Sequence, residues 1–351
     1  MPQLTSHKIT SHKIASHKIT SHKVASHKVA SHKKAVCDYK AATRRAVVKV
    51  TNLPASFDIQ KMRYVEPKNS DLAIGLVYFN AVKSKRLLMN YLYIKERLKI
   101  AKIPVFTIEM YEDVPEISDA IHVKTDFILF QKERLCHLLE KYIPESYPKL
   151  MFMDCDLIFG NPNWYNEVSE KLSHFDVVQP FSRAIWLDLT YKKRMKERLP
   201  IAFYNKLGTI PNSGGIGGYH PGFAWGFNRA WFRANGFFQY AILGDGDTIS
   251  STIWFNYPHF EYKQFLLDAV NTYRASIAMP NTCFVDGTVY HLWHGDSKKR
   301  QYSSRRKIFK DVYDIRAILK VDTNGLFSLK DDALKPQIRA YFTKRDDDGL
   351  F

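Results

Sequence analysis

The chain has 351 residues, of which 45% are hydrophobic, and it carries a formal net charge of +17 at pH 7. This length and composition allow a sizeable hydrophobic core, in one large domain or two smaller ones, and they exclude a wholly disordered chain. No stretch approaches the roughly 18 to 20 continuous apolar residues of a membrane helix, and the N-terminus lacks the apolar segment of a secretory signal. The cysteines are scattered, as is typical of free thiols in a reducing compartment: Cys37, Cys136, Cys155 and Cys283. We therefore expect a soluble, cytoplasmic protein without a transmembrane segment.

The first 45 residues differ from the rest in charge and in repetition. They hold ten Lys or Arg residues and one acid, and they contain SHK six times, from Ser6 to Ser31. A five-residue period fits neither a helix nor a strand, and the segment has too little apolar bulk to fold alone. We expect residues 1–45 to be a disordered basic tail and residues 46–69 to be a linker. The alternatives for the tail are weak contact with nucleic acid or an anionic membrane surface, or metal capture by its histidines.

Regular patterning begins after residue 70. Residues 72–79 (LAIGLVYF) are apolar like a buried strand, residues 87–100 show helical spacing, and residues 103–108 are again strand-like. This succession predicts a right-handed βαβ unit and therefore a parallel sheet. A second helix, expected over residues 131–142, leads into LMFMDCDLIF at residues 150–159. We expect an α/β domain over residues 70–320 and a C-terminal appendage over residues 321–351.

Two aspartates interrupt the apolar run at residues 150–159. In a single strand, Asp154 and Asp156 project to the same side and Cys155 points away. Ligand crevices in open α/β sheets lie beyond the carboxyl ends of the strands. A divalent cation would remove the repulsion between the two acids, as would one shared proton or a pair of basic neighbours. A solvated turn is the alternative to a site.

Two further segments contain glycine and acidic residues. Residues 212–222 (NSGGIGGYHPG) lack the pattern of a phosphate-binding loop, and they indicate either a mobile substrate loop or a surface linker. Asp245 and Asp247 stand in LGDGDTIS, ahead of a helix-like run. One of these acids can cap the helix, which leaves the other unexplained.

A pair of histidines, His291 and His294, opens a strongly basic segment. The cations that follow are Lys298, Lys299, Arg300, Arg305 and Arg306. Imidazole can complete a metal shell, and Lys or Arg can bind phosphate oxygens. The segment therefore predicts a site for a metal-bound diphosphate.

The order of these motifs resembles that of nucleotide-sugar glycosyltransferases of the GT-A fold. The resemblance rests on Asp154-x-Asp156, the later pair Asp245 and Asp247, and HLWHG from His291 on, and it covers residues 71–306. GFAWGFNRAWF followed by GDGDT is similar to the galactosyltransferase-like members, and the ending YFTKRDDD is similar to soluble members of the group. One departure is GDGD where related enzymes often have a Glu-Asp pair.

The resemblance implies a fold and an activity. The fold is a Rossmann-like nucleotide-binding mixed sheet with helices on both faces. The activity is the metal-dependent transfer of a hexose from a UDP-sugar to a hydroxyl of a carbohydrate or glycoconjugate acceptor, with inversion. Asp247 is the implied general base, and the departure at GDGD leaves Asp245 as the alternative.

The resemblance also implies which residues bind the metal and the donor. Asp156 is the direct metal ligand and His294 the third protein ligand, with Asp154 and His291 as further candidates for the metal. Asp154 could instead contact the ribose or a metal-bound water. A mixed carboxylate and imidazole shell suits Mn²⁺ better than Mg²⁺. The other candidates for the donor site are Tyr78, Asn80, Lys298, Arg300 and Trp225. For Trp225, which could stack on a sugar, the alternative is core packing.

Two competing hypotheses remain. A phosphatase of the haloacid-dehalogenase type would use Asp154 as nucleophile, but Ile158 stands where that family has a small hydroxylated residue. A nucleic-acid-binding protein would use the basic tail, but the rest of the chain has no recognisable nucleic-acid-binding motif.

Overall fold

The computed structural model describes residues 50–211, 218–257, 260–301 and 305–349. All of these residues belong to one compact unit. The tail at residues 1–45 and most of the glycine-rich segment lie outside the described residues, so the expectations for both stay predictions. Among the described residues, no helix combines the length and the apolar composition that crossing a membrane requires.

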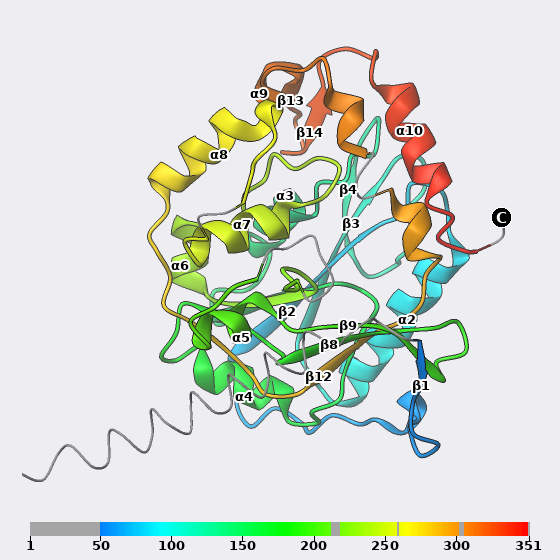
Figure 1. The fold of residues 1–351 in the computed structure, drawn as a ribbon, viewed down its shortest axis with the longest axis vertical. Helices are drawn as coiled ribbons and strands as arrows, with labels where there is room; N and C mark the ends of the chain where they lie inside the picture. Colours follow the sequence, from blue (N-terminus) through cyan, green and yellow to red (C-terminus); the bar gives the residue numbers. More distant parts are fainter. Residues whose placement is uncertain (1–49, 212–217, 258–259, 302–304, 350–351) are drawn as a thin grey trace, which may run out of the picture. The chain divides into compact units, whose positions relative to one another are not determined.

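The larger sheet contains the βαβ unit that the sequence predicts (Figure 1). The order of its strands is β11 (Thr282–Phe284), β7 (Val177–Gln179), β10 (Ala224–Asn228), β5 (Lys149–Met153), β2 (Leu72–Phe79), β3 (Val105–Tyr111) and β4 (Ile121–Lys124). β2 pairs in parallel with β3 and β5, whereas β10 is antiparallel to both of its neighbours. β2 is almost wholly buried, as its unbroken apolar sequence predicts for a central parallel strand. The structure therefore confirms an α/β fold with a mixed sheet.

A second sheet divides the strand that we predicted at residues 150–159. β5 ends at Met153, and the apolar residues after the aspartates form β6 (Leu157–Phe159). β6 belongs to the second sheet, in the order β1 (Thr51–Asn52), β9 (Lys193–Arg198), β8 (Arg183–Leu187), β12 (Thr288–His291) and β6. The prediction of one continuous strand was therefore wrong. Both halves of the apolar run are buried, so the sequence pattern does not show that the chain passes from one sheet to the other. Asp154 and Asp156 lie in the turn between the two sheets.

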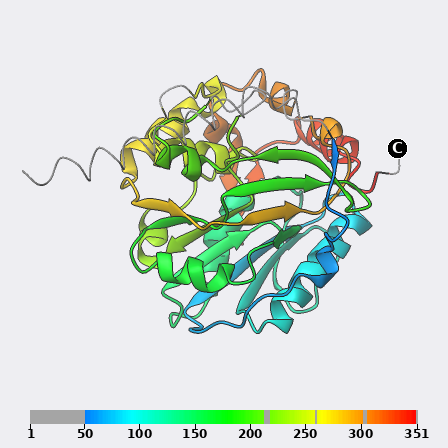
Figure 2. The ribbon, with the colours of Figure 1, turned by 60° about the horizontal axis from the view of Figure 1, so that its bottom comes forward.

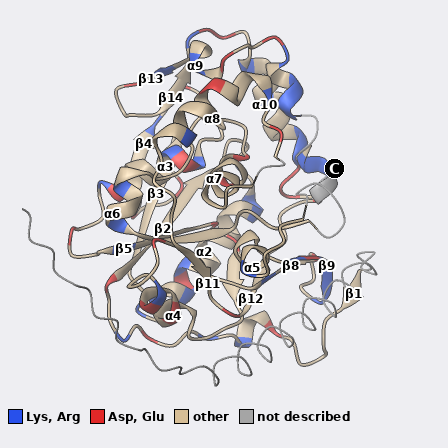
Figure 3. Cartoon of the chain, turned by 60° about the vertical axis from the view of Figure 1, so that its left-hand side comes forward, with Lys and Arg blue, Asp and Glu red and all other residues tan. Residues whose placement is uncertain are grey.

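Helices surround the strands of the two sheets (Figure 2). The α-helices are α2 (Lys85–Ile100), α3 (Lys132–Glu140), α4 (Trp164–Lys171), α5 (Ile201–Lys206), α6 (Arg229–Ala234), α7 (Gly246–Trp254), α8 (Gln264–Ser276), α9 (Ile315–Ile318) and α10 (Lys335–Lys344). Short 3₁₀ turns are η1 (Ile59–Lys61), η2 (Ser297–Arg300) and η3 (Arg305–Phe309), and β13 (Leu319–Val321) pairs with β14 (Phe327–Leu329). α2 and α3 confirm the two helices expected before the aspartates. Figure 3 shows acidic and basic residues interspersed over the elements in view.

The start of α2 depends on a residue from the far end of the chain. Ser84 Oγ accepts a hydrogen bond from the backbone N–H of Leu87 at 3.2 Å, as an N-cap does. Asp348 Oδ1 accepts from the Ser84 hydroxyl and from the Arg86 backbone N–H, each at 2.7 Å. A carboxylate at a helix N-terminus is favoured by the helix dipole. The C-terminal segment is thereby held against the domain.

Candidate active site

A large cavity of about 2050 Å³ lies where the two sheets meet. It is lined by the end of β2, the turn between β5 and β6, the end of β12, residues 195–198 of β9, and the first residues of α3 and α7. The cavity contains most of the residues singled out in the sequence: Tyr78, Asn80, Asp154, Asp156, Asp245, Asp247, His291, His294 and Arg300. Tertiary structure thus brings the three motifs to one place.

Asp156, His291 and His294 converge inside this cavity. Oδ2 of Asp156 lies 2.8 Å from Nε2 of His294 and 3.5 Å from Nε2 of His291, and the two Nε2 atoms are 3.3 Å apart. The three side chains could hold one metal ion, and each residue is less than a tenth exposed. His291 comes from the end of β12, which pairs with β6 just after Asp156. This pairing is why residues far apart in sequence meet.

The chemistry of the cluster fits a divalent cation. Oδ1 of Asp156 is buried and has no hydrogen-bond partner among the described residues. Burial alone would raise the pKa of the Asp156 carboxyl, but the histidines in their protonated forms, the hydrogen bond to His294 and the charge of Arg300 lower it below its ordinary value. Burial lowers the pKa of His291 to about 3, so this imidazole is neutral and can offer a lone pair. An ionised carboxylate and a neutral imidazole are the forms in which these side chains bind metals.

His294 is oriented from behind by a carboxylate. Nδ1 of His294 lies 3.2 Å from Oδ1 of Asp347, a buried residue of the C-terminal segment. An Nδ1–H that donates to Asp347 leaves the lone pair of Nε2 facing Oδ2 of Asp156, so a proton or a metal cation has to lie between those two atoms. A carboxylate behind a ligating histidine is the usual second shell of protein metal sites. Arg300 donates to the backbone oxygen of His294 at 3.1 Å, and the same Nη2 lies 2.8 Å from His294 Nδ1, so it adds positive charge beside the cluster.

Asp154 has a different partner from Asp156. Its Oδ1 accepts a hydrogen bond from Nζ of Lys132 at 2.8 Å, at the start of α3. Burial alone would lower the pKa of Lys132, but carboxylates around it, led by Asp154, raise it well above its ordinary value. Lys132 is therefore a cation that faces the cavity. The metal-ligand role expected for Asp154 stays a prediction, since the side chains that converge as a possible metal site are those of Asp156 and the histidines.

Glu133 stands next to Lys132 and is a buried acid. It is 1% exposed, and its Oε2 has no hydrogen-bond partner among the described residues. Burial raises the pKa of its carboxyl to about 7. Its carboxyl packs against Gly246, where an added Cβ would come within 2.3 Å of Glu133 Cδ. A side chain at position 246 would therefore collide with Glu133, which explains why glycine stands between the two aspartates of GDGD.

The two aspartates of GDGD have unlike surroundings. Asp245 precedes α7 at a φ of 85° and pairs with Arg305 and with Arg306, whose Nε lies 2.8 Å from Asp245 Oδ2. Asp247 instead accepts from the backbone N–H of Thr248 at 2.6 Å through Oδ1. Oδ2 of Asp247 lies over Gly222, where a Cβ would come within 2.0 Å of it. Asp245 is thus occupied by two arginines, while Oδ2 of Asp247 forms no hydrogen bond or ion pair in the described part of the chain.

The remaining predicted donor residues divide into three groups. Tyr78 and Asn80 line the cavity, and each donates to Oε2 of Glu116, at 2.9 and 3.0 Å. The side chain of Lys298 lies outside the described residues. Trp225 is 2% exposed, donates to the backbone oxygen of Pro221 at 2.9 Å, and packs edge-on against Trp254. A sugar-stacking role for Trp225 is therefore corrected to core packing, because the aromatic core covers its ring.

The sequence analysis did not identify four residues that lie at the site. The sequence features that could have indicated them differ in strength. Lys132 and Glu133 fall in the first turn of a helix that we predicted, and only the sheet topology shows that this turn faces the site. Asp347 belongs to the acidic run in YFTKRDDD, which we noted without a role. Lys196 comes from β9, a strand that the sequence analysis did not predict.

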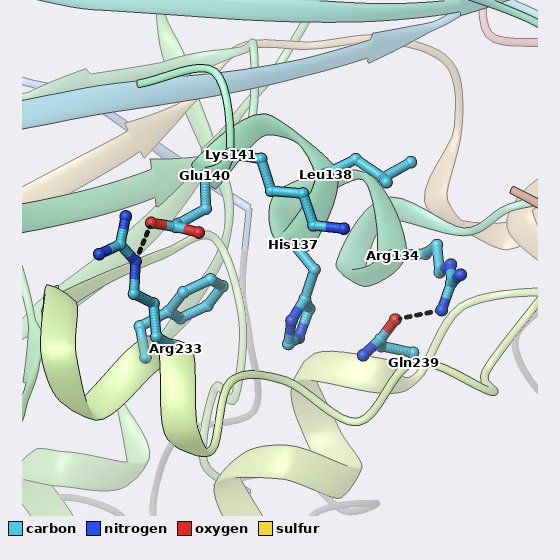
Figure 4. A pocket seen from close by; sticks show the side chains of 8 residues that line it. Arg134, His137, Leu138, Glu140, Lys141, Arg233 and Gln239 are labelled. Carbon is cyan, nitrogen blue, oxygen red and sulfur yellow. Dashed lines mark hydrogen bonds and ion pairs between the residues drawn. The ribbon is translucent and has the colours of Figure 1, made fainter. Parts of the chain in front are cut away.

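A smaller cavity of about 220 Å³ lies along another face of α3 (Figure 4). Its charged groups already pair with one another: Arg233 Nε lies 2.7 Å from Glu140 Oε1, and Arg134 donates to Gln239 Oε1 at 3.0 Å. His137 Nε2 accepts from the backbone N–H of Phe237 at 3.0 Å, and burial lowers the pKa of His137 to about 4. These satisfied groups make a structural cluster and leave the large cavity as the candidate active site.

Comparison with known proteins gives matches among solved structures alone, since no family model and no curated protein matches the chain. The catalytic domain of Drosophila β1,4-galactosyltransferase 7, in complex with xylobiose, is similar at 12% identity and a TM-score of 0.34, over 76% of this chain and 98% of that one. Glucosyl-3-phosphoglycerate synthase of M. tuberculosis is similar at 12% identity and a TM-score of 0.32, over 68% and 78%. Mannosyl-3-phosphoglycerate synthase of Rubrobacter xylanophilus is similar at 10% identity and a TM-score of 0.35, over 71% and 80%. At scores and identities this low, the function has to be argued from the site.

Proposed function

We propose that this chain is a metal-dependent glycosyltransferase of the GT-A type, which moves a hexose from a UDP-sugar to a hydroxyl of a carbohydrate or glycoconjugate acceptor. The observation that carries the proposal is the convergence of Asp156, His291 and His294 inside a cavity of about 2050 Å³ that Asp247 also lines. A cavity of this size can hold a nucleotide-sugar together with an acceptor.

The metal would be held by Asp156, His291 and His294. A mixed shell of carboxylate and imidazole favours Mn²⁺ over Mg²⁺, which prefers oxygen ligands. A divalent cation at this place would stabilise the negative charge on the departing diphosphate as a Lewis acid. In the tautomer that carries its proton on Nδ1, His294 would donate to Asp347, and Asp347 would fix the ring with Nε2 free for the metal.

The cations around the cluster suit the rest of the diphosphate. Arg300 lies beside His294, and Lys132 lies beside Asp154. Both cations line the same cavity as the carboxylates. Charge-assisted hydrogen bonds from such groups stabilise phosphate oxygens. Tyr78 and Asn80, at the end of β2, would lie next to the nucleobase, at the edge where open α/β sheets bind nucleotides.

Asp247 is the general base in this proposal. Its Oδ2 faces Gly222, free of the arginine contacts that occupy Asp245. A positioned carboxylate can take the proton from an acceptor hydroxyl as that hydroxyl attacks the sugar. Direct attack by the acceptor on the face opposite the leaving diphosphate inverts the anomeric carbon.

Ligand-dependent thermal stabilisation tests the proposal, because a ligand that binds only the native state raises its melting temperature. We expect UDP to raise the melting temperature with Mn²⁺ and not with EDTA, and GDP and CMP to do so less. Asp156→Ala should abolish both this shift and sugar transfer, whereas Asp286→Ala, which changes an exposed acid outside the cavity, should preserve them. Full UDP binding and transfer in EDTA would contradict the proposal. Hydrolysis of p-nitrophenyl phosphate would instead favour a phosphatase with Asp154 as nucleophile.

A further inference from the structure

Residues 195–198 of β9 line the large cavity, and two of them are basic. Lys196 and Arg198 alternate along the strand, so they lie on the same face, and both line the cavity. Lys196 is paired across the sheet with Trp186 of β8, and Trp186 is paired in turn with His291 of β12. Neighbouring strands lie about 4.8 Å apart, so the backbone of Lys196 is roughly 10 Å from that of His291. Lys196 is thus in the same cavity as the cluster of Asp156, His291 and His294, but two strands away from His291.

Lys196 has no carboxylate to balance it among the described residues. Its Nζ lies over the ring of Trp186, 4.4 Å from the ring centroid, and no hydrogen bond or ion pair is formed by it in the described part of the chain. The adjacent acid, Glu197, is taken by Arg183 and Arg194. Burial, and then the charges of Arg198 and Arg300, lower the pKa of Lys196 to about 8. The surroundings of this amine are therefore cationic.

A second observation at the same place is an unsatisfied imidazole. Nε2 of His220 is buried and has no hydrogen-bond partner among the described residues. The His220 ring packs edge-on against Trp186, with ring centroids 4.9 Å apart. Burial, followed by the charge of Lys196, holds the pKa of His220 well below its ordinary value. Lys196 and this neutral imidazole therefore lie close together in the cavity, and neither Nζ of Lys196 nor Nε2 of His220 has a hydrogen-bond or ion-pair partner among the described residues.

The cationic face of β9 is connected to the proposed base by a short segment. His220 contacts Trp186 at one end, and Gly222 lies against Oδ2 of Asp247 at the other. Two residues of chain span at most about 7 Å. A molecule whose hydroxyl reaches Asp247 can therefore extend toward Lys196 within the same cavity.

We propose that Lys196, with Arg198 beside it, binds an anionic group of the acceptor, a phosphate or a carboxylate. The anion site itself follows from β9, whereas its assignment to the acceptor rests on the proposed function. Arg300, beside His294, and Lys132, beside Asp154, line the same cavity and are the cations assigned to the donor diphosphate in the proposed function. Lys196 and Arg198 would then bind a negatively charged group of the acceptor, in a part of the cavity that the donor does not occupy.

The test measures anion binding separately from donor binding. Full-length protein saturated with UDP and Mn²⁺ is titrated with inorganic phosphate and with acetate, which stand for the two kinds of anionic group. Lys196→Met is compared with wild type, with Lys196→Arg as the charge-conserving variant. Lys193→Met is the control, because this lysine is exposed on the same strand and does not line the cavity. Removing a partly buried and unbalanced cation should not destabilise the fold, which melting temperatures will verify.

We expect Lys196→Met to weaken binding of the preferred anion by roughly tenfold to a hundredfold, as for the loss of a charge-assisted hydrogen bond. UDP affinity, the Lys196→Arg variant and the Lys193→Met control should stay within about twofold of wild type. In a transfer assay, a sugar phosphate or a uronic acid should then be a better acceptor than the corresponding neutral sugar. Comparing the sugar phosphate with the uronic acid identifies the anionic group.

Three results would overturn the proposal. One is the absence of phosphate and acetate binding to the wild type, and another is binding that Lys196→Met does not change. A third is an equal loss of UDP affinity in Lys196→Met, which would assign the lysine to the donor diphosphate. If the wild type fails to bind UDP at all, the proposed function fails, and the same anion titrations on the unliganded protein still decide whether the site on β9 exists.

Discussion

Nδ1 of His294 lies 3.2 Å from Oδ1 of Asp347, across 53 positions of the sequence. The two residues on either side of Asp347 are also fixed: Asp346 accepts from Nζ of Lys299 at 2.7 Å, and Asp348 caps α2. Burial alone would raise the pKa of Asp347, but Arg345 and then His294 lower it to about 2. The last residues of the chain therefore contribute an ionised carboxylate to the site, although the sequence indicated an appendage there.

Asp347→Ala should weaken Mn²⁺ binding by about 10- to 100-fold, because the ring of His294 loses the group that orients it. Titration of the protein with Mn²⁺, followed by the electron paramagnetic resonance signal of the free ion, measures this directly and needs no substrate. Asp346→Ala is the matched control, since it removes a neighbouring ion pair and leaves His294 untouched. An equal loss in both variants would mean that the segment acts by general packing and not through the imidazole.

Asp247→Asn and Asp245→Asn should fail in different ways. We expect Asp247→Asn to lower kcat by about 10²- to 10⁴-fold, with unchanged UDP affinity and melting temperature, because it removes a proton acceptor. Asp245→Asn should instead lower the free energy of unfolding by about 3 kcal/mol, because it leaves the buried guanidinium of Arg305 without its carboxylate. Steady-state kinetics and urea unfolding of both variants give the comparison. If the Asp245→Asn protein is stable but inactive, Asp245 and not Asp247 is the general base.

Gly246→Ala should destabilise the protein by about 1 to 3 kcal/mol, although alanine is ordinarily the better helix residue. The reason is the contact of the new Cβ with the carboxyl of Glu133, at 2.3 Å from Cδ. Glu133→Ala in the same chain should cancel most of this loss. A double-mutant cycle by urea unfolding measures the coupling, and additive effects would show that Glu133 can move away without cost.

Glu133 also predicts a pH dependence of stability. Burial raises the pKa of its carboxyl in the folded state from 4.5 to about 7, so between these values the folded protein holds a proton that the unfolded chain has released. Stability must therefore fall as the pH rises from 4.5 toward 7, and the total loss is on the order of 3 kcal/mol. Glu133→Gln cannot ionise and should lack this slope. The difference in unfolding free energy between wild type and Glu133→Gln, measured at pH 5 and at pH 8, isolates the effect, and an equal difference at both pH values would rule it out.

The local pattern of the sequence was sufficient for the elements that precede the aspartates. LAIGLVYF forms β2 over the predicted residues 72–79, and the helices expected around residues 87–100 and 131–142 are α2 and α3. Burial on both faces and helical periodicity are properties of short segments, so they can be read without knowing the rest of the chain. The break between β5 and β6 could not be read in this way. Both halves are apolar, and the change of sheet depends on the pairing of β6 with β12.

The sequence by itself determined the α/β class, the acids Asp154 and Asp156 at the end of a buried strand, and the histidine pair that should meet them. Tertiary structure alone decided that Asp156 joins His291 and His294 while Asp154 joins Lys132, that Asp347 supports His294, and that Lys196 faces the same cavity. The physical reason is range. Secondary structure follows from neighbours a few residues apart, whereas a site of charged side chains depends on strand pairings and chain crossings between residues that are separated by up to the length of the domain.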